Sequence, residues 1–146
     1  MNRSDARLLV VDDSPSMRMC LCYLLRQLGF VHLDEAPNGA DALTLYKRTA
    51  YDLVITDWSM PHLSGVELLS AIRNGNRRNL TPVLLLTGSV SHGNLNEAVE
   101  AGVTGFVPKP FFNPSLTEQV TNLIAMAPQA PMYEELGDAE SLLASC

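Results

Sequence analysis

Short apolar runs alternate along the chain with longer segments in which apolar residues recur every three or four positions. The runs at 8–11, 53–56 and 83–86 are too short and too uniformly apolar for anything but buried strands. Two further short segments, 31–36 and 104–107, occupy strand positions in the same alternation. The pattern therefore predicts five short strands, each followed by an amphipathic helix.

Start and stop signals mark the predicted helices. Ser14 and Pro15 form a cap and a first helical residue, and Gly29 ends that helix. The other helices are predicted over 40–48, 64–73 and 91–101, and from Asn113 and Pro114 onward. The apolar stripes of the first, third, fourth and last helices are expected to be Met17, Cys20, Leu21, Leu24, Leu25 and Leu28; Val66, Leu69 and Ile72; Leu95, Ala98 and Val99; and Leu116, Val120, Leu123 and Ile124.

Five β-α units in succession predict a parallel sheet with helices on both faces, since right-handed crossovers leave few other arrangements. The fold class is thus a doubly wound α/β sandwich of five strands and five helices. We expect one domain over 1–127, followed by a Pro-containing linker and a short acidic amphipathic tail over 128–146. Met132, Leu136 and Leu143 would lie near one face of the tail. It is either a frayed end or a helix that docks on this domain or on a partner.

Composition narrows the class of protein. The chain has 146 residues, 47% of them hydrophobic, and none of its apolar runs approaches the length of a membrane span. Its start carries no secretory signal pattern, so a cytoplasmic protein is expected. The net charge of −6 has the wrong sign for direct nucleic-acid binding. Cys20 and Cys22 point to different faces of one predicted helix, which indicates reduced thiols, and the scattered histidines exclude a zinc site.

Polar residues follow the predicted strands at the edge where ligands bind in open α/β sheets. Asp12 and Asp13 come after the first strand, Asp57 after the third, Thr87 after the fourth and Lys109 after the fifth. Three acids at close range repel one another unless one is protonated or a cation is bound, and Mg²⁺ suits carboxylates together with phosphate oxygens. Asp57 can then act as a nucleophile towards a phosphoryl group, whose oxygens Thr87 and Lys109 would contact.

Four segments carry a resemblance to a known family. They are Val10-Val11-Asp12-Asp13-Ser14; Thr56-Asp57-Trp58-Ser59-Met60-Pro61 with Gly65; Leu86-Thr87-Gly88; and Phe106-Val107-Pro108-Lys109-Pro110-Phe111. From about residue 7 to 127 the chain resembles the receiver domain of bacterial two-component response regulators, most closely the single-domain chemotaxis regulators. The resemblance implies a flavodoxin-like strand order 2-1-3-4-5.

The resemblance also implies a set of residue roles. Asp57 would accept the phosphoryl group from a sensor histidine kinase or phosphotransfer protein. Asp13, Asp57 and the Ser59 backbone carbonyl would ligate Mg²⁺, with Asp12 acting partly through bound water. The chain would catalyse only its own phosphotransfer and dephosphorylation.

A switch is implied as well. Thr87 would move towards the phosphoryl group, and Phe106 would turn inward behind it. The surface formed by 91–101, 104–107 and the last helix would then change its affinity for a downstream effector protein. Phe106 stands where tyrosine is usual, so a hydroxyl is lost there.

Three other functions fit the sequence less well. An aspartyl phosphatase generally carries a second acid two residues after its nucleophile, and Ser59 occupies that position. A dinucleotide-binding enzyme would need a glycine-rich turn after the first strand. A receiver-like binding module that works without phosphorylation is disfavoured because all the site residues are present. The chain is either a stand-alone regulator or the receiver of a longer response regulator.

Overall fold

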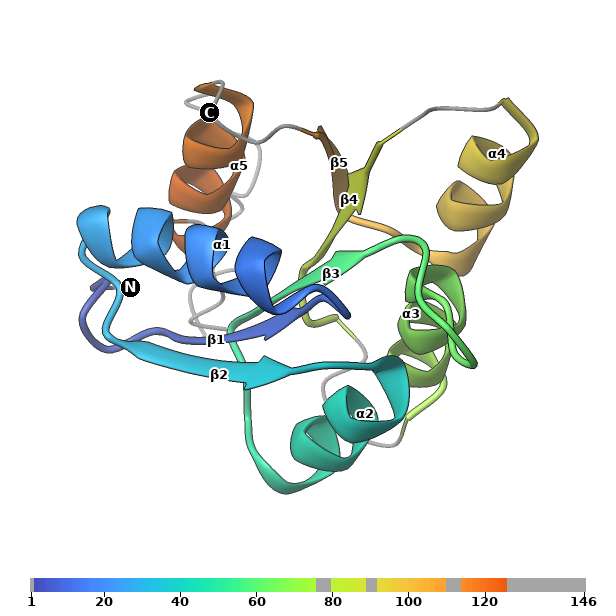
Figure 1. Ribbon diagram of the computed structural model, residues 1–146, viewed down its shortest axis with the longest axis horizontal. Helices are drawn as coiled ribbons and strands as arrows, with labels where there is room; N and C mark the ends of the chain where they lie inside the picture. Colours follow the sequence, from blue (N-terminus) through green and yellow to red (C-terminus); the bar gives the residue numbers. More distant parts are fainter. Residues whose placement is uncertain (1, 76–79, 89–91, 110–113, 126–146) are drawn as a thin grey trace, which may run out of the picture.

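One parallel sheet of five strands, in the order β2-β1-β3-β4-β5, forms the centre of the molecule in a computed structural model (Figure 1). The structure describes residues 2–75, 80–88, 92–109 and 114–125, so the predicted tail over 128–146 lies outside the described residues. The strands are β1 (Arg7–Val11), β2 (His32–Ala36), β3 (Leu53–Asp57), β4 (Val83–Thr87) and β5 (Gly105–Pro108). The helices are α1 (Pro15–Gln27), α2 (Gly39–Arg48), α3 (Gly65–Arg73), α4 (His92–Ala101) and α5 (Pro114–Ala125).

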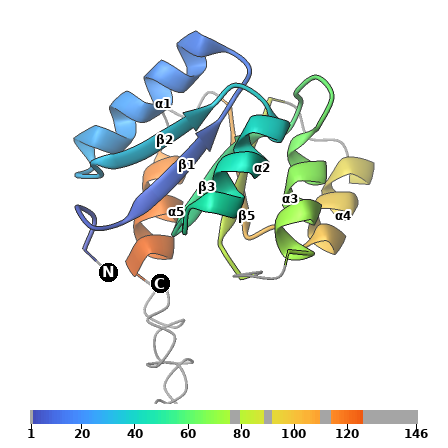
Figure 2. The ribbon, with the colours of Figure 1, turned by 90° about the horizontal axis from the view of Figure 1, so that it is seen from below.

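The helices cover both faces of the sheet, as the sequence predicts. Figure 2 shows α1 and α5 together on one face and α2, α3 and α4 on the other. Alternate side chains of a strand point to opposite faces of the sheet and pack in two separate cores. In β1, Leu8 and Val10 lie on the side of α1 and α5, and Leu9 and Val11 lie on the opposite side. Strands β3 and β4 are buried along their whole length, which explains why they are apolar up to the polar residues at their carboxyl ends. The fold is therefore the predicted doubly wound, flavodoxin-like arrangement.

Two of the predicted capping residues begin helices as expected. The Ser14 hydroxyl accepts a hydrogen bond from the Met17 amide, and Pro15 follows as the first helical residue of α1. Ser64 and Glu67 form a reciprocal capping box at the start of α3. These caps determine where each helix leaves the sheet edge that carries the candidate site.

Two predicted core positions are wrong. Cys20 is exposed, and the buried stripe of α1 is Leu21, Cys22 and Leu25 instead, because these three residues share the arc of the helix that faces the sheet. Val99 of α4 is 61% exposed, and Ala98 makes the contact with the core. Cys20 and Cys22 do point to different faces and are free thiols. Among the described residues, none of the helices has the length and hydropathy to span a bilayer.

Candidate functional site

Three carboxylates meet at the carboxyl edge of the sheet. Asp12 directly follows β1 and Asp57 ends β3, and these strands are paired neighbours with Val11 opposite Thr56. One carboxylate oxygen of each of Asp12, Asp13 and Asp57 lies within 4.8 Å of the others. Asp12 and Asp57 are buried, whereas Asp13 is exposed. The structure therefore brings together the three acids that the sequence singled out.

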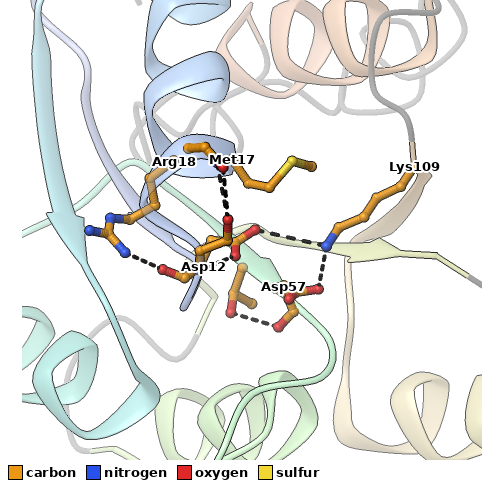
Figure 3. Close-up of polar contacts among 8 residues, drawn as sticks. Asp12, Met17, Arg18, Asp57 and Lys109 are labelled. Carbon is orange, nitrogen blue, oxygen red and sulfur yellow. Dashed lines mark hydrogen bonds and ion pairs between the residues drawn. The ribbon is translucent and has the colours of Figure 1, made fainter.

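Lys109 supplies the cation of this cluster. Its Nζ lies 3.0 Å from Asp57 Oδ1 and 3.8 Å from Asp12 Oδ2 (Figure 3). The Lys109 amide donates to the Thr87 carbonyl at 2.8 Å, and Thr87 pairs with Pro108 across β4 and β5. Since Thr87 is buried at the end of β4, the backbone itself holds this threonine and the lysine at the same edge as the acids.

Asp12 is held by contacts that leave one oxygen available. Its Oδ1 accepts a hydrogen bond from the Ser14 amide at 2.9 Å, and its backbone carbonyl accepts one from Arg18 Nη1 at 2.5 Å. Among the described residues, its buried Oδ2 has no hydrogen-bond donor, and the ammonium of Lys109 lies 3.8 Å away. Burial is the main cause that raises the pKa of Asp12; the Ser14 amide opposes this, and the charge of Asp57 adds to it.

The donor set fits a hard divalent cation. This cluster offers carboxylate oxygens, which are the ligands that Mg²⁺ prefers. The unsatisfied, buried Oδ2 of Asp12 is an acceptor that a metal ion or its water can use. A bound cation would also relieve the repulsion among the three carboxylates, because Lys109 supplies a single positive charge beside Asp57 and Asp12.

The loop after Asp57 is held tightly against the end of the sheet. The Trp58 amide donates to the Leu86 carbonyl at 3.0 Å, and the Trp58 carbonyl accepts from Gly65 at 2.9 Å. A β-carbon on Gly65 would lie only 2.4 Å from the Asp57 carbonyl oxygen, which explains a glycine there. Ser59 is exposed on this loop and lines an open pocket of about 450 Å³ together with Trp58, Met60, Pro61 and Ser64.

An aromatic pair links this loop to β5. The rings of Trp58 and Phe106 stack with centroids 5.7 Å apart and an interplanar angle of 18°. Both side chains are half-buried, and Phe106 lies opposite Leu85 in the sheet. The sequence singled out Phe106 but not this contact. Nor did it point to Arg18 as a partner of Asp12, because neither interaction leaves a local pattern in the sequence.

The chain belongs to the response regulator receiver family, whose model matches residues 8–121. Chemotaxis protein CheY of Pseudomonas aeruginosa is 38% identical over 117 residues, covering 80% of this chain and 94% of the relative. Chemotaxis protein CheY-3 of Vibrio cholerae is also 38% identical, over 80% of this chain and 90% of the relative. These matches confirm the resemblance to receiver domains that the four sequence segments carry.

Solved structures agree with the fold. The structure of CheY4 of Vibrio cholerae has a TM-score of 0.74 at 33% identity, covering 81% of this chain and 98% of that one. The receiver domain of a sensor histidine kinase from Pseudomonas aeruginosa, which has a magnesium ion coordinated in its active-site cleft, has a TM-score of 0.75 at 25% identity. That match covers 82% of this chain and 98% of the other.

Proposed function

We propose that this chain is a phospho-acceptor switch that receives a phosphoryl group on Asp57 from a phosphohistidine of a sensor histidine kinase or phosphotransfer protein. The observation that carries the proposal is the buried carboxylate of Asp57, which lies within 4.8 Å of two other acids and 3.0 Å from the ammonium of Lys109. An isolated structural ion pair would not need the two additional acids, whose charges raise the cost of burial.

Phosphoryl transfer requires a nucleophile, a leaving group and stabilisation of the charge on the phosphoryl oxygens. An Asp57 carboxylate oxygen forms the new O–P bond as the N–P bond of the donor breaks, and the electron pair leaves with the imidazole nitrogen, which is then protonated. Lys109 would hold one phosphoryl oxygen by charge, and the Thr87 hydroxyl would hold another. Water would later attack phosphorus, release inorganic phosphate and restore the carboxylate.

The metal ligands in this proposal are Asp13, Asp57 and the backbone carbonyl of Ser59, with Asp12 acting through a water molecule. Mg²⁺ at this position would neutralise charge on the phosphoryl oxygens. The exposed position of Asp13 and Ser59 leaves one side of the site open to solvent and to a phosphate donor.

The output is proposed to be a change of affinity for a downstream effector protein on the surface formed by α4, β5 and α5, in chemotaxis-type signalling. Thr87 ends β4, and Phe106 lies in the neighbouring strand β5, opposite Leu85. A change at the phosphoryl group would therefore be transmitted to this surface through one pair of strands. The stack on Trp58 places Phe106 next to the loop that follows Asp57. Phosphorylation acts only as far as these contacts differ between two states.

The proposed receiver unit is 1–127, in the cytoplasm, and the remaining residues are linker and tail. The family match ends at residue 121 and α5 ends at Ala125, which supports this boundary. The 38% identity to chemotaxis proteins over 117 residues supports the signalling branch.

Intact-mass measurement after incubation with acetyl phosphate tests the proposal. We expect one phosphoryl adduct that requires both Mg²⁺ and Asp57, so that Asp57→Asn gives none while keeping its circular dichroism spectrum. Asp41→Asn, at an exposed acid of α2, is the matched control and should be labelled like the wild type. An adduct on Asp57→Asn, or labelling without a divalent cation, would overturn the assignment.

A further inference from the structure

The outer face of α1 is unusually apolar for a surface helix. Met19 is 71% exposed and Tyr23 is 62% exposed, and their spacing of four places them on one side of the helix. Cys20 is exposed between them. In contrast, the exposed residues of α5 are Pro114, Thr117, Glu118, Asn122 and Ala125, none of them a large apolar side chain. The α1 face is therefore a candidate docking surface.

Basic side chains lie along this helix. α1 contains Arg18 and Arg26 and no acidic residue; Arg18 is already paired with Glu35 of β2 at 3.4 Å, whereas Arg26 is exposed. Arg3 lies at the carboxyl end of the same helix, where its Nη1 donates to the Leu28 carbonyl at 2.7 Å. A partner that is apolar on one side and acidic on the other would match this surface.

The carboxyl-terminal segment of the same chain has that character. Residues 132–146 contain four acids, Glu134, Glu135, Asp138 and Glu140, and no lysine or arginine. At helical spacing, Met132, Leu136, Ala139 and Leu143 recur at intervals of four, three and four and share one face. As a helix, these fifteen residues would span about 22 Å, close to the roughly 20 Å of the thirteen-residue α1.

The chain leaves the described domain close enough to reach α1. Helices α1 and α5 pack on the same core cluster and lie side by side on one face of the sheet (Figure 2). Each helix runs back along the strand that precedes it, so both end at the edge opposite the acid cluster. Seven residues from Ala125 to Met132 reach roughly 25 Å when extended, whereas packed helices are only about 10 Å apart.

We propose that the segment 132–146 docks as an amphipathic helix on the outer face of α1 and covers Met19 and Tyr23. Its apolar stripe would lie against these two side chains, and its acids would lie near Arg26 and Arg3. Running from the carboxyl end of α1 towards its start, the segment would bring Cys146 to the half of α1 that holds Cys20. This contact does not depend on phosphorylation of Asp57.

The cysteines of the chain provide a direct proximity test. Cys22 is buried, and burial raises its pKa to about 11, so it reacts slowly. Copper(II)-phenanthroline in air should therefore take two electrons and two protons from Cys20 and Cys146 and form one intramolecular disulfide, seen by peptide mapping. Cys20→Ser should abolish this product, and Cys22→Ser should not.

Matched tail variants separate docking from random collision of a tethered segment. Leu136→Glu places a charge on the apolar stripe, whereas Leu142→Glu makes the same change on a different face. We expect Leu136→Glu to slow disulfide formation several-fold and Leu142→Glu to leave it near the wild-type rate. Equal rates in the two variants, or a covalent dimer as the main product, would overturn the proposal, the latter in favour of a second copy on this face.

Amide chemical shifts provide an independent readout on the reduced, full-length chain. Leu136→Glu should shift resonances of α1 between Met19 and Arg26, while Leu142→Glu should leave them in place. Shifts confined to α4 and β5, or no shift in α1, would contradict docking on this helix.

Discussion

Substituting alanine for Gly65 tests how closely the loop after Asp57 is packed. The added β-carbon would lie 2.4 Å from the Asp57 carbonyl oxygen, 3.0 Å from a Leu85 methyl group and 3.1 Å from the Trp58 α-carbon. Two of these three atoms belong to the backbone, which cannot rotate away as a side chain can. Relief of the contact with Asp57 therefore requires a shift of about 1 Å in the loop or in the start of α3, given that carbon and oxygen atoms ordinarily approach to about 3.3 Å.

The expected cost follows from this geometry. Overpacking of a well-packed site costs about 1–3 kcal/mol, and a clash with backbone places Gly65→Ala at the upper end of that range. With a urea m-value of about 1.5 kcal/mol per M, the midpoint of unfolding should fall by roughly 1–2 M. Because Asp57 is part of the clash, the rate of labelling by acetyl phosphate should fall as well.

Gly88→Ala provides a matched control at the same edge of the sheet. Apart from its chain neighbours, no atom of the described residues lies within 4 Å of a β-carbon added to Gly88, and this glycine does not have a positive φ angle. Its replacement should leave the midpoint unchanged or raise it slightly, because alanine reduces the entropy of the unfolded chain. Circular dichroism in urea measures both variants, and equal midpoints for Gly65→Ala and Gly88→Ala would refute the packing argument.

Substitutions at three further residues test polar contacts. The Tyr51 hydroxyl donates to Asp34 at 2.6 Å, so Tyr51→Phe should lower the free energy of unfolding by roughly 1–2 kcal/mol in urea titrations at neutral pH. Burial, and then Asp34, raises the pKa of Tyr51 to about 12. The stabilisation by this hydrogen bond is therefore complete below about pH 10 and is lost as the pH rises through 12. If the free energy of unfolding of the wild type and of Tyr51→Phe changed in parallel with pH, this prediction would be contradicted. Lys109→Ala removes the ammonium beside Asp57, so Mg²⁺ should raise its melting temperature more than that of the wild type in thermal scans, and an equal rise would argue against the lysine as counter-ion. The Arg73 guanidinium donates to two backbone carbonyls and one threonine hydroxyl, so Arg73→Ala should cost about 1–3 kcal/mol, and the shorter reach of Arg73→Lys should recover only part of it.

Much of the fold was predictable because its signals are local. A buried parallel strand must be apolar on both faces, and Leu53–Asp57 and Val83–Thr87 are fully buried as expected. Helix starts were predictable because Ser14 and Ser64 satisfy backbone amides within three residues of themselves. Cys20 was misassigned because helical periodicity does not fix the rotation of the helix about its own axis to better than about one residue. Only packing against the sheet decides which side of the helix is buried.

The acids of the candidate site were predictable for a topological reason. Residues that follow neighbouring parallel strands must share an edge, so Asp12, Asp57 and Lys109 were expected together before any distance was known. The stack of Trp58 on Phe106 and the bond from Arg18 to the Asp12 carbonyl could not be predicted in this way. Both depend on side-chain directions that arise only when separate elements pack.

The sequence by itself determined the alternation of strands and helices, the caps, and the residue types at the carboxyl edge, because each of these is written within a few consecutive residues. Only the tertiary structure decided that Lys109 Nζ lies 3.0 Å from Asp57, that Asp12 has a buried oxygen with no donor in the described part of the chain, and that α1 leaves Met19 and Tyr23 exposed. These features depend on how strand register and helix rotation combine across the molecule. Distances of a few ångströms between residues far apart in the chain are set by the packing of whole elements, and short-range patterns in a sequence do not contain them.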